Sequence, residues 1–470
     1  MKQAILFLML FTSGSLLAQH QHGEKKDSVP VMHHQGMKMD TVPKGNHHPM
    51  KMDTVSRGHN PAMEMPGTMN HDHFMSHAYS LNLPMNRNGS GTAWLPDASP
   101  MYMYMTGKKT MWMFHGSAFL RYTNTGVFKN TDRSSSKFDA PNWFMAMLNR
   151  RVGKRGLFTA KAMVSADRLT EGGGGYPLLF QSGESWRGNP LVDRQHPHDL
   201  FSELSIGYSH AVSRDLDVFG YAGYPGEPAL SAPAFMHRIS AMNNPDAPLG
   251  HHWQDATHIT FGVATLGVRY RQFKLESSVF TGREPGEDRY NFDKPRLNSY
   301  SYRLSYNPSR NWAFQFSQGF IESPEALHPE EDVTRTTASA LYSKQLTHSA
   351  QLDAALIWGL NDSGEDHQEH SVLLESNLQF AKSAVYQRYE FIQKSAGELG
   401  LETELGHQAF NIHVLTTGYN HRILRLGVIE LVGGGQLTYN LPAKQLKPFY
   451  GSFPVGAQIY LQLRPGRSGM

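Results

Sequence analysis

Trp312-Ala-Phe-Gln-Phe-Ser-Gln-Gly319 is the stretch that decides the fold, because large aromatic side chains occupy every second position. In an extended strand the rings at 312, 314 and 316 share one face, and small or polar residues take the other. The same alternation recurs at 300–306 and 351–358. Segments of this kind, separated by turn residues, are typical of a transmembrane β-barrel, although a soluble β-sandwich also alternates.

The connections between these segments favour the barrel over the sandwich. Short turns, such as 153–155, 309 and 382–383, alternate with long loops, as in bacterial outer-membrane barrels. The chain is therefore predicted to be all-β, a transmembrane antiparallel β-barrel of about sixteen strands within residues 109–470, with about fourteen to eighteen still compatible. Because the short turns face the periplasm in such barrels, both chain ends are expected there. The expected strands cover residues 110–122, 142–152, 156–168, 199–212, 214–224, 258–270, 272–283, 297–308, 310–320, 333–347, 349–360, 371–382, 384–394, 408–420, 422–436 and 449–463.

Composition excludes several classes of function. The chain has no cysteine, so a disulfide framework, a zinc-thiolate site and a cysteine nucleophile are all ruled out. A formal charge of +3 spread over 470 residues gives no nucleic-acid footprint. No later stretch approaches the 18 apolar residues of a spanning helix, so entry into a membrane requires strands.

The first residues have the pattern of a secretory signal peptide. Lys2 is followed by an apolar run at 4–11 and by small residues up to Ala18. We therefore expect residues 1–18 to be removed on export, with cleavage after Ala18.

Residues 19–108 are expected to form a disordered His/Met-rich segment, because few branched aliphatic residues are available to offset the entropy of ordering. Within it Met37-Lys-Met39-Asp-Thr-Val42 recurs as Met50-Lys-Met52-Asp-Thr-Val55, and Met63-Glu-Met65 begins a third copy. Thioethers suit Cu(I) and imidazoles suit Cu(II) or zinc, so the array predicts copper binding, with silver or zinc as alternatives, against the simpler interpretation of a solvated linker. The predicted ligands are Met37, Met39, Met50, Met52, Met63, Met65, His33, His34, His47, His48, His59, His71 and His73.

Methionines also alternate with aromatic residues at the start of the barrel. For these five we expect packing in the core or against lipid in preference to metal binding. They are Met101, Met103, Met105, Met111 and Met113.

The polar faces of the strands predict a lumen of mixed charge, which favours a narrow or weakly selective passage. The residues assigned to it are Lys161, Glu203, Lys274, Glu276, Arg303, Arg335, Asp353, Glu375, Arg388, Glu390 and His413.

Polar clusters in the long loops fall at one end of the expected barrel, so they could converge on a metal, substrate or hydrolytic site. Alternatively, they tie the loops together by hydrogen bonds. The possible loop site consists of His196, His198, His237, His251, His252, Asp255 and His258. No Gly-x-Ser-x-Gly elbow or His-Glu-x-x-His pair accompanies it, so no catalytic residue and no organic cofactor is predicted.

Four segments, 177–181, 191–200, 250–258 and 283–285, resemble a family of bacterial outer-membrane β-barrel proteins without an assigned activity. This resemblance implies the fold and adds no catalytic residue. The overall plan of a His/Met-rich leader before a barrel is similar to copper-resistance protein B of the outer membrane. That similarity implies an outer-membrane location and copper handling.

The leading hypothesis is a non-enzymatic outer-membrane protein for copper or related metal handling, through binding, efflux or resistance. Its periplasmic His/Met-rich tail would capture ions, and its partners would be outer-membrane lipid, metal ions and periplasmic metal carriers. One alternative is a general porin or solute channel in which the leader is incidental. Another is a barrel hydrolase that acts on lipid.

Overall fold

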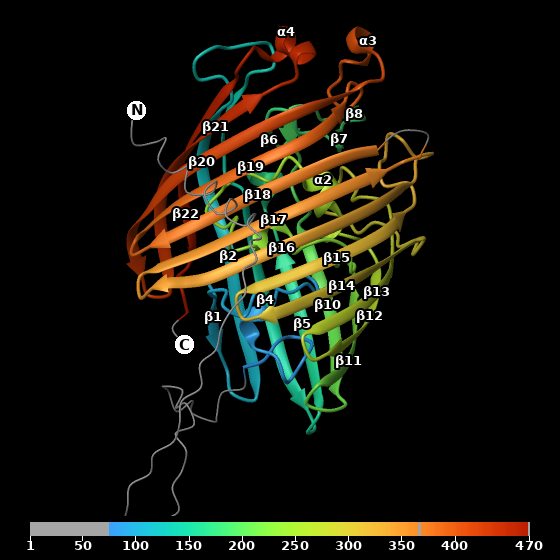
Figure 1. Cartoon of the computed structure of the whole chain (residues 1–470), viewed down its shortest axis with the longest axis vertical. Coiled ribbons are helices and arrows are strands. Elements are labelled where there is room, and N and C mark those ends of the chain that lie inside the picture. Colours follow the sequence, from blue (N-terminus) through green and yellow to red (C-terminus); the bar gives the residue numbers. More distant parts are fainter. Residues whose placement is uncertain (1–74, 365–367, 469–470) are drawn as a thin grey trace, which may run out of the picture. The chain divides into compact units, whose positions relative to one another are not determined.

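The strands join into one antiparallel sheet that closes on itself (Figure 1). In this computed structural model, residues 75–364 and 368–468 are described. The sheet has eighteen strands, of which two short ones, β1 (Tyr104–Thr106) and β3 (Ser136–Asp139), pair with β2. The other sixteen form the barrel wall, and the pairing of β2 with β22 closes it. The prediction of a sixteen-strand antiparallel barrel is confirmed.

Each wall strand matches one of the predicted segments, with shifts at the ends. The wall strands are β2 (Thr110–Asn124), β4 (Asn142–Val152), β5 (Gly156–Val164), β10 (Phe201–Ala211), β11 (Leu216–Gly223), β12 (Val263–Tyr270), β13 (Phe273–Phe280), β14 (Ser299–Ser309), β15 (Trp312–Ile321), β16 (Val333–Thr347), β17 (Ala350–Asp362), β18 (Gln368–Phe380), β19 (Ser383–Ser395), β20 (Ala409–Leu426), β21 (Ile429–Leu441) and β22 (Val455–Pro465).

The remaining elements are short and lie in the loops and in the segment before β1. They are β6 (Tyr176–Pro177), β7 (Ser185–Trp186), β8 (Asn189–Pro190), β9 (Arg194–Gln195), α1 (Asp167–Thr170), α2 (His251–Gln254), α3 (Glu402–Leu405), α4 (Lys447–Tyr450), η2 (Met85–Arg87), η3 (Phe235–His237), η4 (Ala256–His258) and η5 (Lys444–Leu446). Within the part of the chain that the structure describes, no helix has the length and apolarity needed to cross a membrane.

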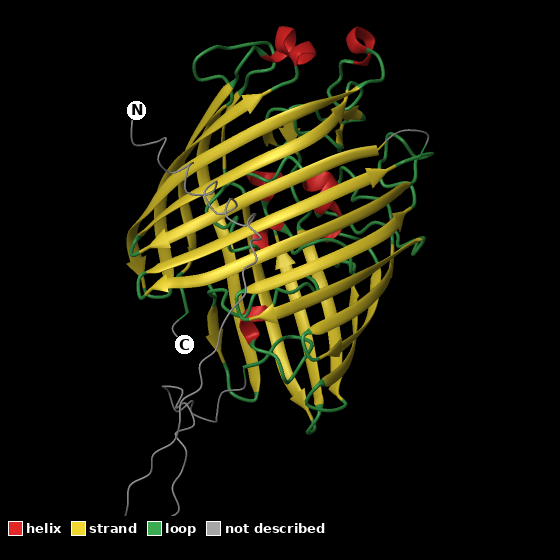
Figure 2. Ribbon diagram, viewed as in Figure 1, coloured by secondary structure: helices red, strands yellow, loops and turns green. Residues whose placement is uncertain are grey.

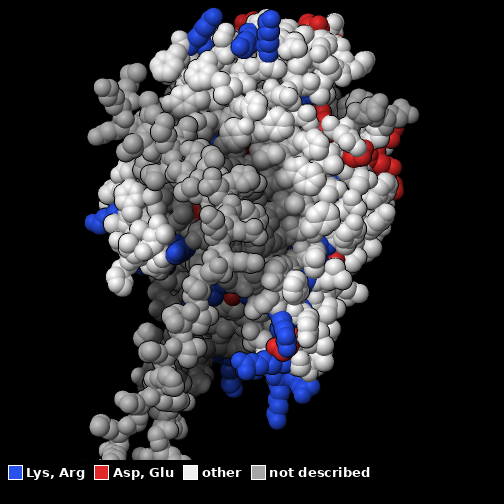
Figure 3. Space-filling model, in the orientation of Figure 1, with Lys and Arg blue, Asp and Glu red and all other residues white. Residues whose placement is uncertain are grey.

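The wall places apolar side chains outside and polar ones inside, the reverse of a soluble protein. In β12, Leu266 and Val268 are exposed on the outer face, whereas Thr265 and Arg269 are buried on the inner one. Figure 3 shows a largely uncharged middle of the visible face, with Lys and Arg gathered at its lower end and again at its top, and Asp and Glu at its upper right. An apolar outer band around a polar interior is what lipid requires, so this is a transmembrane barrel of the outer-membrane type.

Short connections of two to four residues lie at one end of the wall, and the long connections lie at the other. One predicted turn is wrong: the hairpin of β20 and β21 turns at 427–428 and not at His421, because the ladder continues from Arg422 to Leu426. β20 is therefore longer than the pattern suggested, and β21 lies several residues nearer the C-terminus.

The predicted lumen residues are buried inside the barrel, apart from His413. His413 lies on the outer face beside Tyr389 and Phe391, so its assignment is wrong. Its neighbours Ile412 and Val414 point inward instead, where they pack with Leu249 and other apolar loop residues. The polar-inside rule fails at this place because the lumen is filled by apolar protein and not by water.

Residues 75–103 run inside the barrel and are here called the plug. Tyr79 packs on Phe219 and Tyr221 of β11, and Arg87 binds Asp97 at 2.6 Å. The wall also binds the plug's backbone: Thr159 Oγ1 donates to the Ala78 carbonyl at 2.6 Å. Disorder was therefore the wrong prediction for residues 75–108, because the wall supplies partners that local composition does not reveal. Residues 19–74 lie outside the described part, as does the predicted signal peptide at 1–18.

The connection 224–262, here called the lumen loop, folds back into the barrel and carries α2 with it (Figures 1 and 2). Arg238 is buried and binds Asp255 at 3.1 Å and Glu375 of β18 at 2.8 Å. Asp246 binds Arg121 of β2 at 2.7 Å. These bridges join the loop to two separate strands of the wall and keep the lumen filled.

Candidate functional site

Five histidines from two long connections meet inside the barrel and form what is here called the histidine cluster. His196 and His198 come from the connection between β5 and β10, and the other three from the lumen loop, on α2 and η4. Ring centroids of neighbouring members lie 5.1–5.6 Å apart in four pairs: His251–His258, His251–His252, His196–His252 and His198–His258. The structure thus brings together six of the seven residues of the predicted loop site, including Asp255.

Most rings of the cluster are held by a carboxylate. The Nδ1 atom of His198 lies 2.6 Å from Asp167, that of His251 lies 2.5 Å from Asp255, and that of His252 lies 3.4 Å from Glu284. The Nε2 atom of His196 lies 3.1 Å from a carboxylate oxygen of Glu184, and His258 Nδ1 donates to the Asp255 carbonyl at 2.7 Å. Such second partners fix the ring and its tautomer, as they do for metal-ligating histidines.

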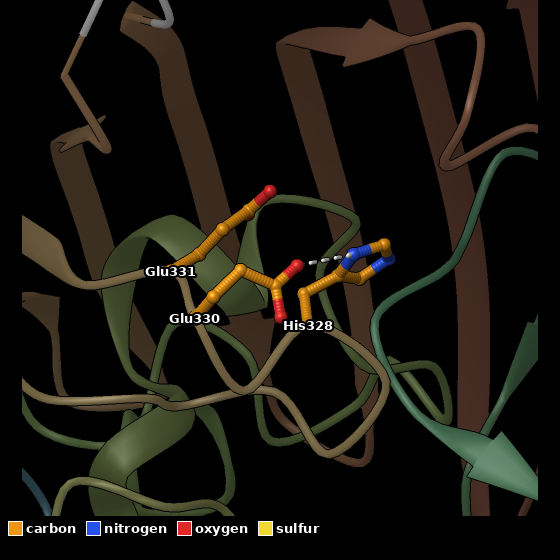
Figure 4. Close-up of side chains that lie close together, drawn as sticks. All are labelled: His328, Glu330 and Glu331. Carbon is orange, nitrogen blue, oxygen red and sulfur yellow. Dashed lines mark ion pairs between the residues drawn. The ribbon is translucent and has the colours of Figure 1, made fainter.

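Three Nε2 atoms of the cluster, those of His198, His252 and His258, are buried without a hydrogen-bond partner. They do not yet converge on one point. Among the described residues, one set of three His, Asp or Glu side chains has all its ligand atoms within 4.8 Å of one another. It consists of His328, Glu330 and Glu331, which are exposed on the loop between β15 and β16 and do not belong to the histidine cluster (Figure 4). The cluster therefore has the chemistry of a metal site and an open arrangement of its ligands.

Burial lowers the pKa of His196, His251 and His258 and so keeps these three imidazoles neutral. It lowers the pKa of His258 to about 3, with His251 and His198 adding to the shift, and it lowers the pKa of His196 well below the ordinary value. Burial acts to raise the pKa of Asp255, but His251 and Arg238 outweigh it and the pKa falls below the ordinary range. Neutral imidazoles beside an ionised carboxylate retain the lone pairs that bind cations.

The loop end of the barrel holds a cavity of about 840 Å³, here called the acidic vestibule. Arg283 is the one arginine in the described lining, which has no lysine. Glu184 is paired with Arg289 and Glu398 with Lys394, and the other six glutamates of the described lining have no lysine or arginine partner among the ion pairs found. The glutamates that line it are Glu184, Glu284, Glu287, Glu325, Glu331, Glu369, Glu398 and Glu402.

A second cavity, of about 150 Å³, lies deeper between the plug, the lumen loop and strands β2 and β4. It is here called the methionine chamber, because Met85, Met101, Met113, Met145 and Met147 line it. His237, the seventh residue of the predicted loop site, lies here and not in the histidine cluster; its ring is 5.5 Å from that of His115 on β2.

The alternating methionines were expected to pack in the core or against lipid. They pack inside the barrel. Met111 and Met113 are buried, and Met103 and Met105 pack partly buried against the same cluster. The chamber was missed because its walls come from separate parts of the chain. A usable signal existed: β2 and β4 each carry two methionines in alternation, at 111 and 113 and at 145 and 147.

The three spaces adjoin one another. A narrow cavity of about 10 Å³ within the histidine cluster shares His252 and Glu284 with the acidic vestibule, and it shares His198 with the methionine chamber. A solute moving inward would meet carboxylates, then imidazoles, then thioethers. The hydrogen bonds found for the five imidazoles of the histidine cluster go to carboxylates, backbone and Gln195, and none goes to a serine. This geometry gives no support to a Ser-His hydrolase in the cluster.

The tail ligands predicted from the Met-x-Met repeat all precede residue 75, outside the described residues, so their role stays a prediction.

No family model matches the chain, and no curated protein matches its sequence. Solved structures that resemble it include OmpF of Salmonella typhi in complex with daunomycin, at TM-score 0.46 and 9% identity over 76% of this chain and 98% of that one. Another is the anion-selective porin of Comamonas acidovorans, at 0.42 and 12%, over 76% and 99%. The outer-membrane channel DcaP of Acinetobacter baumannii gives 0.42 and 9%, over 77% and 100%. At such values the likeness carries no argument, and the similarity to copper-resistance protein B is not shown. The barrel assignment rests on the strand pairing itself.

Proposed function

We propose that this chain is an outer-membrane channel for cations, held in a narrow or closed state by its own plug and lumen loop. The observation that carries the proposal is the acidic vestibule, which leads to a buried cluster of histidines inside a sixteen-strand barrel. A barrel of this size has room for an aqueous channel when it is not filled.

The charges of the vestibule favour cations over anions. Burial acts to raise the pKa of Glu284, but His252 and Arg335 outweigh it and keep this carboxyl ionised. Burial, together with the nearby Glu284 and Glu398, raises the pKa of Glu325 to about 8. Carboxyls that raise one another's pKa in this way are crowded negative groups, and a cation that enters would relieve their repulsion.

The test is ion selectivity of the purified protein in planar bilayers under a KCl gradient. We expect a reversal potential of the sign for cation selectivity. A triple variant, Glu284→Gln, Glu325→Gln and Glu398→Gln, should move this potential toward zero. The matched control, Asp132→Asn, Asp215→Asn and Glu404→Gln, removes the same number of acids from exposed sites outside the vestibule and should leave it unchanged. Anion selectivity, or equal effects of the two triple variants, would contradict the proposal.

Copper handling by the His/Met-rich tail is a second candidate, supported by the repeated Met-x-Met and His-His pairs. Here the tail would lie in the periplasm, capture copper, silver or zinc, and exchange it with periplasmic carriers. Deleting residues 31–70 removes the repeats and spares the plug, which starts at 75. Cells with the deletion should lose any copper tolerance that the full-length protein confers, at equal abundance in the outer membrane. Equal tolerance would rule out a role for the tail in copper handling.

A further inference from the structure

The methionine chamber gathers nearly every methionine that the structure describes. Its cluster contains seven buried methionines and four partly buried ones. Among the described residues, Met242 is the one methionine outside the cluster, and it lines the same cavity. The other apolar clusters of the barrel interior contain leucine, isoleucine, valine, alanine and aromatic residues and no methionine.

Packing alone does not explain this segregation. Methionine is a flexible gap filler, so a cluster of methionines serves packing best where it removes voids. Here the thioethers surround a cavity of about 150 Å³, although leucine and isoleucine fill neighbouring parts of the same lumen. The side chains reach the cavity from separate elements: Met113 and Met147 face each other across the ladder of β2 and β4.

Nitrogen ligands stand at the wall of the same cavity. His115 Nε2 lies 2.9 Å from the Met145 sulfur. The ring of His237 is 5.5 Å from that of His115, and the indole of Trp143 is 5.2 Å and 5.0 Å from the two imidazoles. Burial lowers the pKa of His237 well below its ordinary value, so this imidazole is neutral. An aromatic face beside the ligands further favours a cation.

We propose that the methionine chamber is a binding site for a soft monovalent cation, Cu(I), held by the thioethers of Met113, Met145 and Met147 with the imidazole of His115. Thioethers select soft ions of this kind over Zn²⁺, Mg²⁺ or Ca²⁺, which prefer harder ligands. The inference deepens the proposed function, because it names the class of cation that the channel takes. The order of ligands along the lumen, from carboxylates to imidazoles to thioethers, becomes softer inward.

The probe is Ag(I), which has the same preference for sulfur and does not change oxidation state. The full-length protein is prepared with Met37, Met39, Met50, Met52, Met63 and Met65 changed to leucine, so that the tail's paired thioethers do not contribute. Three further substitutions on this background, Met113→Leu, Met145→Leu and Met147→Leu, remove sulfur from the chamber. The matched control, Met75→Leu, Met105→Leu and Met163→Leu, alters three methionines of the same cluster that do not line the cavity.

Equilibrium dialysis should find a tightly bound Ag(I) on the background protein and on the control. The chamber variant should bind it at least tenfold more weakly. A background protein that binds no Ag(I), or a control that loses as much as the chamber variant, would overturn the site. If the chamber variant does not fold, X-ray absorption of Ag(I) on the background protein decides. Sulfur neighbours support the site, and oxygen and nitrogen alone refute it. Failure here leaves the KCl selectivity test unaffected, so the two proposals can fail separately.

Discussion

The barrel wall and the material inside it come from one chain but follow different rules. The wall repeats one local pattern, apolar outward and polar inward, and each strand needs only its two neighbours. The plug and the lumen loop have almost no regular structure and depend on bonds to residues far away in the sequence, such as Arg238 to Glu375. The wall is therefore stabilised by its contact with lipid and by the hydrogen bonds between neighbouring strands, whereas the interior is stabilised by buried ion pairs. The two parts should respond to different perturbations.

The largest effect is expected from Arg238→Ala, which removes a buried cation from between Asp255 and Glu375. Breaking a buried ion pair by removing one partner costs about 3–5 kcal/mol. Glu375 keeps Arg388 as a partner, but Asp255 loses its arginine. The lumen loop should detach while the wall remains closed, so single-channel conductance should rise several-fold. Arg271→Ala is the control, since this arginine pairs with Asp215 while 64% exposed and should cost about 0–1 kcal/mol. Unchanged conductance in the Arg238 variant would show that the interior does not depend on this bridge.

A wall variant should have the opposite profile. Leu266→Arg puts a charge on the outer face of β12, at a side chain that is 75% exposed, and should destabilise the barrel by about 2–4 kcal/mol in lipid. Leu169→Arg changes an equally exposed leucine in α1, at the loop end, and should cost about 0–1 kcal/mol. Urea unfolding in lipid vesicles measures both. Equal losses would mean that 266 does not face lipid.

Mild acid should loosen the interior before it affects the wall. The folded pKa of His258, about 3, lies below its unfolded value of about 6.5, so its contribution to stability is complete above pH 6.5 and is lost as pH falls toward 3. The titratable groups facing it are His251, His198 and Asp255. Conductance should therefore rise between pH 7 and pH 5.

His258→Gln should weaken this acid response, because an amide does not titrate. His407→Gln, at a side chain 84% exposed, should leave it unchanged. An acid response that is identical in both variants would place the titrating group elsewhere.

The smallest effect concerns the acidic vestibule. With a pKa of about 8, Glu325 is mostly neutral at pH 7 and mostly charged at pH 9. Cation selectivity of the wild type should therefore increase over this range, as measured by the reversal potential in a KCl gradient. Glu325→Gln should remove most of the increase. A wild-type potential that does not change between pH 7 and pH 9 would show that Glu325 already carries its charge.

The wall could be predicted from sequence because its signal is local. Alternation at 312–319 and short turns such as 153–155 place strands without knowledge of the rest of the fold. His413 was misplaced because its strand faces packed loop residues, a contact between distant parts of the chain. The plug was missed for the same reason: Tyr79 packs on strand β11, and Arg87 donates to Gln272 in the turn between β12 and β13, both far away in the sequence.

The candidate site was predictable only in part. The alternation of short and long connections predicts that the two histidine-rich loops share one end of the barrel. This prediction was enough to group the six residues that the structure brings together. His237 lies apart from these six, beside His115 of β2. No pattern in the sequence links these two histidines. The methionine chamber needed the register of β2 against β4, which places Met113 opposite Met147. Register is set by pairing along the whole ladder, and the sequence of one strand does not contain it.

The pairing of β2 with β22 also sets an order of assembly. The plug precedes β2 in the chain and is enclosed by a wall whose last strand is also the last to leave the ribosome. The first and last wall strands must pair to close the barrel. The plug therefore has to be in place before β2 and β22 complete their hydrogen bonds, or it has to enter from the end of the short turns. Side chains such as Thr159, which bind the plug, would then act as guides during insertion as well as anchors afterwards.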